Sequence, residues 1–133
     1  MLKSDPKHSQ TRSQISIRVF IFEPDHLKAA AFAQMVREHI APFADITRLE
    51  NKPYWKIQGW SEVFLIVQPP TTTKPASVFN SILSSLGKGW EKHGVGDDEY
   101  QWAVWNPKPD CAFRWALVRW ANVELFPEPQ LAH

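Results

Sequence analysis

The patterned part of the chain begins with a strict alternation of apolar and other residues. Within residues 14–23, every second position is a branched apolar residue: Ile15, Ile17, Val19 and Ile21. Successive side chains of a strand point to opposite faces of a sheet, so this alternation predicts a first strand with one buried face. The segment Glu23-Pro24-Asp25 ends that strand.

Two later segments have the three- to four-residue spacing of amphipathic helices. We expect the first helix from about His26 to Ala41, with Asp25 capping its free amide groups and Pro42 stopping it. Its expected inner face comprises Leu27, Ala31, Phe32, Met35, Val36, His39 and Ile40. Pro75 suits the first turn of the second helix, whose apolar stripe comprises Val78, Phe79, Ile82, Leu83 and Leu86.

Extended segments separate and follow the two helices. Residues 45–50 indicate a short strand and residues 51–53 a turn. Residues 54–68 carry several aromatic and branched residues, and they predict either one long strand bent at Gly59 or two shorter strands. Residues 99–126 contain two aromatic-rich runs around the loop 106–110, which predicts a β-hairpin.

The second run of this hairpin raises the question of what its tryptophans do. Residues 113–125 alternate with one apolar face, which Arg119 interrupts, while Trp120 falls on the more polar face beside Arg114, Asn122 and Glu124. The simpler interpretation is that the tryptophans form sheet core and cross-strand pairs. The sharper interpretation is that Trp120 is a partly exposed binding anchor.

The order of elements, β-α-β-β-α-β-β, predicts an α+β fold. We expect an antiparallel sheet of about five strands with two helices packed on one face, as a ferredoxin-like variant. At 133 residues the chain has the length of one domain. Residues 14–127 are expected to form it, with residues 1–13 a disordered tail and residues 128–133 a second tail.

Charge is unevenly distributed along the chain. The net charge is +1, but residues 1–13 contribute +2, and residues 91–110 contribute −3. A folded body without cationic excess is poorly suited to binding phosphate backbones, so no nucleic-acid partner is expected. The local acidic patch would instead attract a cationic partner.

The residues that usually carry chemistry are sparse. Cys111 is the single cysteine and the five histidines are scattered, so we expect no disulfide, metal, cofactor or enzymatic site. There is no pattern of a cleaved leader, and the longest apolar run, residues 63–67, is too short to span a bilayer. We therefore expect a cytoplasmic protein with no membrane partner.

Two stretches carry a resemblance to a known class of proteins. YQWAVWNP at residues 100–107 and VRWANVELFP at residues 118–127 resemble segments of the small immunity proteins that bacteria encode beside polymorphic or contact-dependent growth-inhibition toxins. The resemblance implies a non-catalytic inhibitor that binds the C-terminal domain of a cognate toxin, often a nuclease, and occludes its active site. Such a protein would be a monomer alone and form a one-to-one complex with the toxin.

The acidic patch suggests where a cationic nuclease site would dock. The candidate toxin-binding residues are Asp97, Asp98, Glu99 and Asp110, together with Trp120, Glu124 and Trp90. Two alternatives stay open. One is a small-molecule-binding protein or enzyme with an aromatic-lined cleft between helix and sheet. The other is an RNA-binding sheet platform, which would need a contiguous positive face.

Overall fold

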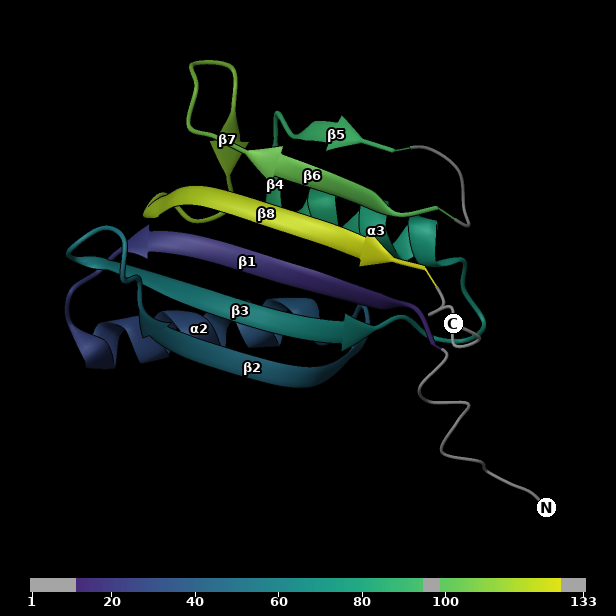
Figure 1. The fold of residues 1–133 in the computed structure, drawn as a ribbon, viewed down its shortest axis with the longest axis horizontal. Helices are drawn as coiled ribbons and strands as arrows, with labels where there is room; N and C mark the ends of the chain where they lie inside the picture. The colour runs from purple at the N-terminus through teal and green to yellow at the C-terminus, as the bar shows by residue number, and fades with distance from the viewer. Residues whose placement is uncertain (1–11, 95–98, 128–133) are drawn as a thin grey trace.

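The computed structural model describes residues 12–94 and 99–127, which form two layers (Figure 1). In chain order the elements are β1 (Gln14–Phe22), α2 (His26–Ile40), β2 (Asp45–Pro53), β3 (Trp60–Gln68), α3 (Pro75–Leu86), β4 (Gly87–Lys88), β5 (Glu91–His93), β6 (Gln101–Trp105), β7 (Ala112–Phe113) and β8 (Val118–Phe126). Six strands form an antiparallel sheet in the order β2-β3-β1-β8-β6-β5, and β4 pairs with β7 in a separate ribbon. The α+β class with two helices is confirmed, with six strands in place of the expected five.

Strand β1 lies near the middle of the sheet. The alternation of its apolar residues allows every second side chain to be buried along the full length of the strand. It pairs with β3 on one side and with β8 on the other. Its four branched residues are fully buried: Ile15, Ile17, Val19 and Ile21. The first strand is therefore found where the sequence pattern predicts it.

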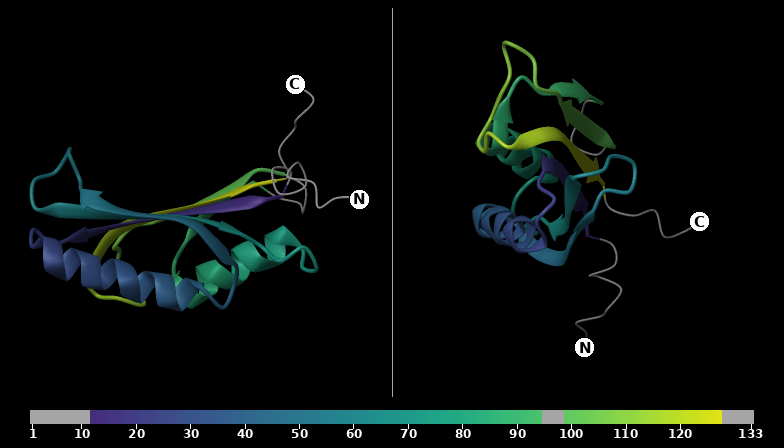
Figure 2. Two further views of the ribbon diagram at one scale, coloured as in Figure 1. Left: turned by 90° about the horizontal axis from the view of Figure 1, so that it is seen from below. Right: turned by 90° about the vertical axis from the view of Figure 1, so that its left-hand side faces the viewer.

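Both helices cover the same face of the sheet (Figure 2). Helix α2 begins at His26 because the Asp25 side chain accepts hydrogen bonds from the backbone N–H groups of Leu27 and Lys28. Its inner face differs from the expected one, since Leu27 and Met35 are exposed while Ala29 and Ala33 are buried. Helix α3 buries its whole predicted stripe.

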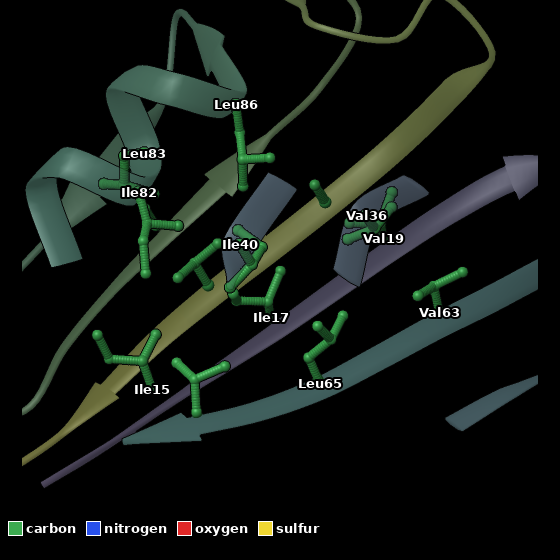
Figure 3. Close-up of a cluster of buried hydrophobic side chains, with 14 of the residues drawn as sticks. Ile15, Ile17, Val19, Val36, Ile40, Val63, Leu65, Ile82, Leu83 and Leu86 are labelled. Atoms are coloured by element: carbon green, nitrogen blue, oxygen red, sulfur yellow. The ribbon is translucent and has the colours of Figure 1, made fainter. Parts of the chain in front are cut away.

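The core lies between the helices and the sheet (Figure 3). Val36 and Ile40 of α2 and Ile82 and Leu86 of α3 are fully buried against the central strands. Burial of this continuous apolar layer is the main stabilising term of the fold. Among the described residues, neither helix combines the length and the apolar character needed to cross a bilayer.

Two β-bulges determine which side chains of β8 and β2 face away from the core. The register of β8 against β1 skips Arg119, so Val118 and Ala121 both face the helices and Trp120 faces away from them. The register of β2 against β3 skips Thr47, and Arg48 thereby turns to the side away from the helices. The Arg119 bulge explains why that residue interrupts the alternation in the sequence.

Two expected boundaries are wrong. Strand β2 continues through the expected turn to Pro53, and the chain reverses in residues 54–59 instead, so Gly59 ends a turn rather than bending a strand. The expected hairpin is interrupted as well. Strands β6 and β8 pair, but residues 112–113 leave them to pair with β4, and β8 begins only at Val118. The backbone N–H of Arg114 donates to Leu86 O, which holds this detour against the end of α3.

Candidate functional site

The face of the sheet opposite the helices carries aromatic and charged side chains. We call it the open face, and Figure 2 shows it on the side away from α2 and α3. Cross-strand pairing aligns Glu50, Phe64, Arg18 and Asn122 across four strands, and the next row contains Lys52, Glu62, Phe20 and Trp120. Exposed sheet faces of soluble proteins usually carry small polar residues, whereas partly exposed aromatic and arginine side chains are typical of binding surfaces.

One end of the open face is hollowed into a groove of 630 Å³, which we call the end groove. Its floor is formed by Phe20, Phe64, Trp120 and Asn122, and its walls by β2 and the loop of residues 54–59. That loop rises above the open face at the end where β2 and β3 are joined (Figure 2). The end groove is therefore bounded by β2 and by the loop that follows it directly in the sequence.

The floor of the end groove contains an ion pair in which only the carboxylate is buried. Arg18 Nε lies 3.1 Å from Glu62 Oε2, and Glu62 is only 6% exposed. The guanidinium carbon of Arg18 lies 4.5 Å from the centroid of the Phe64 ring. The nearly buried carboxylate of Glu62 needs a cationic partner, and this ion pair keeps the half-exposed Arg18 side chain over the Phe64 ring.

The wall formed by β2 has three charged residues at alternate positions. Glu50 accepts from Arg48 and lies 3.9 Å from the Lys52 ammonium group. A single carboxylate thus faces two cations. Lys56 follows in the loop, where its ammonium group lies 5.1 Å from the Trp55 ring centroid, and no ion pair is found for it among the described residues.

Two further hollows continue the end groove across the open face. One of 350 Å³ shares Phe20, Tyr54 and Trp120 with it and adds Ile57 and Trp60. The other, of 250 Å³, shares Arg18 and Phe64 and reaches Glu124 and Phe126. The three hollows therefore adjoin one another, and Glu124 lines the hollow farthest from the loop.

The far end of the open face is organised by Tyr100 and Trp102. The Tyr100 hydroxyl donates to Glu124, and loss of solvent, followed by this hydrogen bond and the charge of Glu124, raises the pKa of Tyr100 to about 12. The Trp102 ring stacks on His93 with centroids 4.0 Å apart. Both rings are thereby held by neighbours within the molecule.

The structure separates the residues predicted for toxin binding. Trp120 and Glu124 lie on the open face, whereas Trp90 is half buried with its indole N–H donating to Leu83 O beneath α3. Glu99 precedes β6 and Asp110 follows it, so these two exposed carboxylates lie toward opposite ends of that strand. Asp97 and Asp98 lie outside the described residues. The predicted patch is therefore not gathered in one place by the described residues.

His39 and Ser85 are the described residues that place a histidine beside a serine hydroxyl. His39 Nε2 lies 2.9 Å from Ser85 Oγ, and the Ser85 hydroxyl donates to Ile82 O in its own helix. Burial, followed by the charge of Arg114, lowers the pKa of His39. The described residues contain no group of three or more metal-ligating side chains.

Most residues of the end groove could not be predicted from sequence patterns. Five of them come from three elements and lie outside the acidic stretch 91–110: Arg18, Arg48, Lys52, Trp55 and Lys56. A usable signal was present in the first strand, where Arg18 and Phe20 alternate with the buried isoleucines. No local signal marks the Thr47 bulge that turns Arg48 to the open face.

Comparisons with protein-family models, with curated proteins and with solved structures found no match to this chain.

Proposed function

We propose that this protein is a non-catalytic inhibitor, an immunity protein that binds the C-terminal domain of a cognate bacterial toxin and occludes its active site. The observation that carries the proposal is the open face, where aromatic and charged side chains remain accessible although the helices already cover the other face. Trp55 is 81% exposed at its edge. An exposed tryptophan in a groove that also contains Arg18 and Arg48 has the composition of protein-binding hot spots.

The size of the open face also supports a protein partner. Four of its strands are nine residues long. At about 3.3 Å per residue and about 4.8 Å between strands, they span roughly 600 Å² before side-chain relief is added. A stable protein interface buries about 800 Å² on each partner, so a toxin domain that covers this face and its loop would bury enough surface.

The proposal also covers the fold family, the cellular compartment and the oligomeric state. We infer that β1, α2, β2, β3, α3 and β8 make a ferredoxin-like core to which β6 and β5 add an edge. An inhibitor of this class works in the cytoplasm, where an incoming toxin would act. It is proposed to be monomeric alone and to bind one toxin domain.

The proposal is tested with the toxin domain that the neighbouring gene encodes. We expect the two proteins to elute together in gel filtration, and the toxin's activity to fall linearly to zero as the inhibitor reaches one equivalent. Stoichiometric inactivation is the signature of occlusion, because a catalyst would inactivate an excess of toxin. Separate elution of the two proteins would refute the proposal.

A single-stranded RNA platform is the second candidate, favoured by one observation. Arg18 and Arg48 lie over the Phe64 ring, and Lys52 and Trp120 line the same groove. Cations interleaved with aromatic rings are typical of such platforms. Glu50, Glu62 and Glu124 on the same face oppose it, because a phosphate backbone would pass close to carboxylates. Binding of a labelled oligonucleotide at low salt decides this alternative.

A further inference from the structure

The loop of residues 54–59 holds its exposed tryptophan in a fixed position. The backbone N–H of Tyr54 donates to Trp60 O at 2.8 Å, and that of Trp60 donates to Ile57 O at 3.2 Å. A third bond, from Glu23 N–H to Gly59 O at 2.9 Å, ties the loop to the end of β1. Trp55 is thus exposed on a loop that is already ordered, so binding would require little further loss of backbone entropy.

The charges around Trp55 leave a local cationic excess. Arg18 is balanced by Glu62, and Glu50 balances only one of Arg48 and Lys52. Lys56 adds a further cation beside the Trp55 ring. The end groove therefore has a formal charge of +2 among its lining residues, whereas the chain as a whole has +1.

The hollow that adjoins this cationic wall is lined mainly by aromatic and aliphatic side chains, together with Asn106 and Arg119. Tyr54, Ile57, Trp60 and Trp120 line it, with the Phe20 ring 4.6 Å from Tyr54 and 5.2 Å from Trp120, measured between ring centroids. Its volume of 350 Å³ is enough for an aliphatic or aromatic side chain. Apolar and cationic groups are thus presented side by side to whatever binds.

We propose that the end groove and its adjoining hollow are the docking site for an acidic segment of the protein partner. Carboxylates of that segment pair with Arg48, Lys52 and Lys56, where Trp55 lines the groove. A neighbouring apolar side chain enters the hollow beside Trp60 and Trp120. The inference rests on the proposed function and specifies its contact surface. It places the cationic groups on the inhibitor and the anionic groups on the partner, which reverses the polarity that the acidic stretch of the sequence suggested.

A protein segment fits the end groove better than a nucleic acid does. Charges of opposite sign alternate along β2 as Arg48, Glu50 and Lys52, about 7 Å apart. A polyanion meets one repulsive contact for every two attractive ones along this wall, whereas a protein segment can place a donor opposite Glu50. The alternation of charge along β2 therefore favours a partner that places carboxylates opposite the cations and a hydrogen-bond donor opposite Glu50.

The test is a selection of short random peptides displayed on phage against the full-length chain, followed by binding measurements on an enriched peptide. We expect enriched sequences to place Asp or Glu next to an aliphatic or aromatic residue. Trp55→Ala should weaken binding about thirtyfold, as loss of a hot-spot tryptophan does. Lys56→Glu should weaken it about tenfold at low salt and flatten its salt dependence.

Matched controls lie on α2, on the other side of the sheet. Met35→Ala removes an apolar side chain that is 45% exposed, and Arg37→Glu reverses an exposed charge. Both should leave peptide affinity within about threefold, since they lie far from the groove. Enrichment of basic or uncharged peptides, no enrichment, or equal affinity for Trp55→Ala overturns the proposal, as does tighter binding of a labelled oligothymidylate.

The same variants separate this inference from the proposed function. If the toxin domain binds the wild type and the double variant Trp55→Ala, Lys56→Glu equally well, the docking site is wrong and the inhibitor function stands. If acidic peptides are selected and depend on Trp55 while the toxin domain does not bind, the docking site stands and the inhibitor function is wrong.

Discussion

Gly59 holds the loop of the end groove in a shape that other residues adopt poorly. Its φ is +85°, and a Cβ atom at this position would lie 2.9 Å from Cε1 of Phe22. We expect Gly59→Ala to lower the free energy of unfolding by about 1–3 kcal/mol, because both the left-handed backbone and the contact are unfavourable. Urea denaturation measures the change. Gln58→Ala, at an exposed neighbour, should stay within about 0.5 kcal/mol, and an equal loss there would contradict the explanation.

His39 makes stability depend on pH. Burial first, and the charge of Arg114 second, lower its pKa below the ordinary value of 6.5, and Ser85, Phe43 and Trp115 surround its ring. The unfolded chain therefore takes up the proton first as pH falls. The stabilising contribution of neutral His39 is complete above about pH 6.5, and it is lost as pH falls through the lower pKa that His39 has in the folded state.

The measurement is the urea midpoint between about pH 7.5 and about pH 5, where His39→Gln should show a smaller decline than the wild type. His26→Gln, a change on the exposed first turn of α2, is the matched histidine control and should keep the wild-type decline. Equal declines in wild type and His39→Gln would show that other groups set the pH dependence.

Among the secondary-structure elements, the ribbon of β4 and β7 connects the end of α3 to the sheet through the contacts of Phe113. Phe113 of β7 lies between tryptophans, with ring centroids 4.9 Å from Trp105 and 5.9 Å from Trp90. Phe113→Ala should lower the free energy of unfolding by about 2–3 kcal/mol, because a half-buried aromatic contact is lost. Phe126→Ala, at the exposed end of β8, should cost less than about 1 kcal/mol. Chemical denaturation of both variants checks this, and similar losses would contradict the role of the ribbon.

The two faces of the whole molecule should respond differently to a bound partner. Hydrogen exchange of the backbone amides in residues 54–59 and along the edge strand β2 should slow when the toxin domain binds, since these segments border the end groove. Exchange in α2 should be unchanged at early times. Mass spectrometry of the free and bound protein measures both. Protection confined to α2 or α3 would place the interface on the helical side.

Much of the architecture could be predicted from local patterns. The alternation in β1, the cap at Asp25 and the stripe of α3 each specify an element from neighbouring residues, because strand and helix periods act over a few positions. The face of α2 was harder to predict. Its apolar positions extend around more than one side, so only the crossing of α2 over the sheet decides that Ala29 is buried and Leu27 exposed.

The candidate site depended on contacts that sequence patterns do not encode. Arg18, Lys52, Lys56 and Trp120 converge only because β1 pairs with both β3 and β8 and because β2 lies beyond β3. The detour of residues 112–113 to β4 also follows from the position of α3 rather than from their own alternation. An acidic stretch in the sequence is visible without structure, but whether its members gather depends on strand register.

The sequence alone therefore determined a two-layer α+β chain with its helices on one face, because burial of an alternating strand and a striped helix is a local requirement repeated along the chain. Tertiary structure alone decided which polar and aromatic residues share the other face. Register and the bulges at Thr47 and Arg119 set that choice, and one skipped residue moves every following side chain to the opposite side of the sheet.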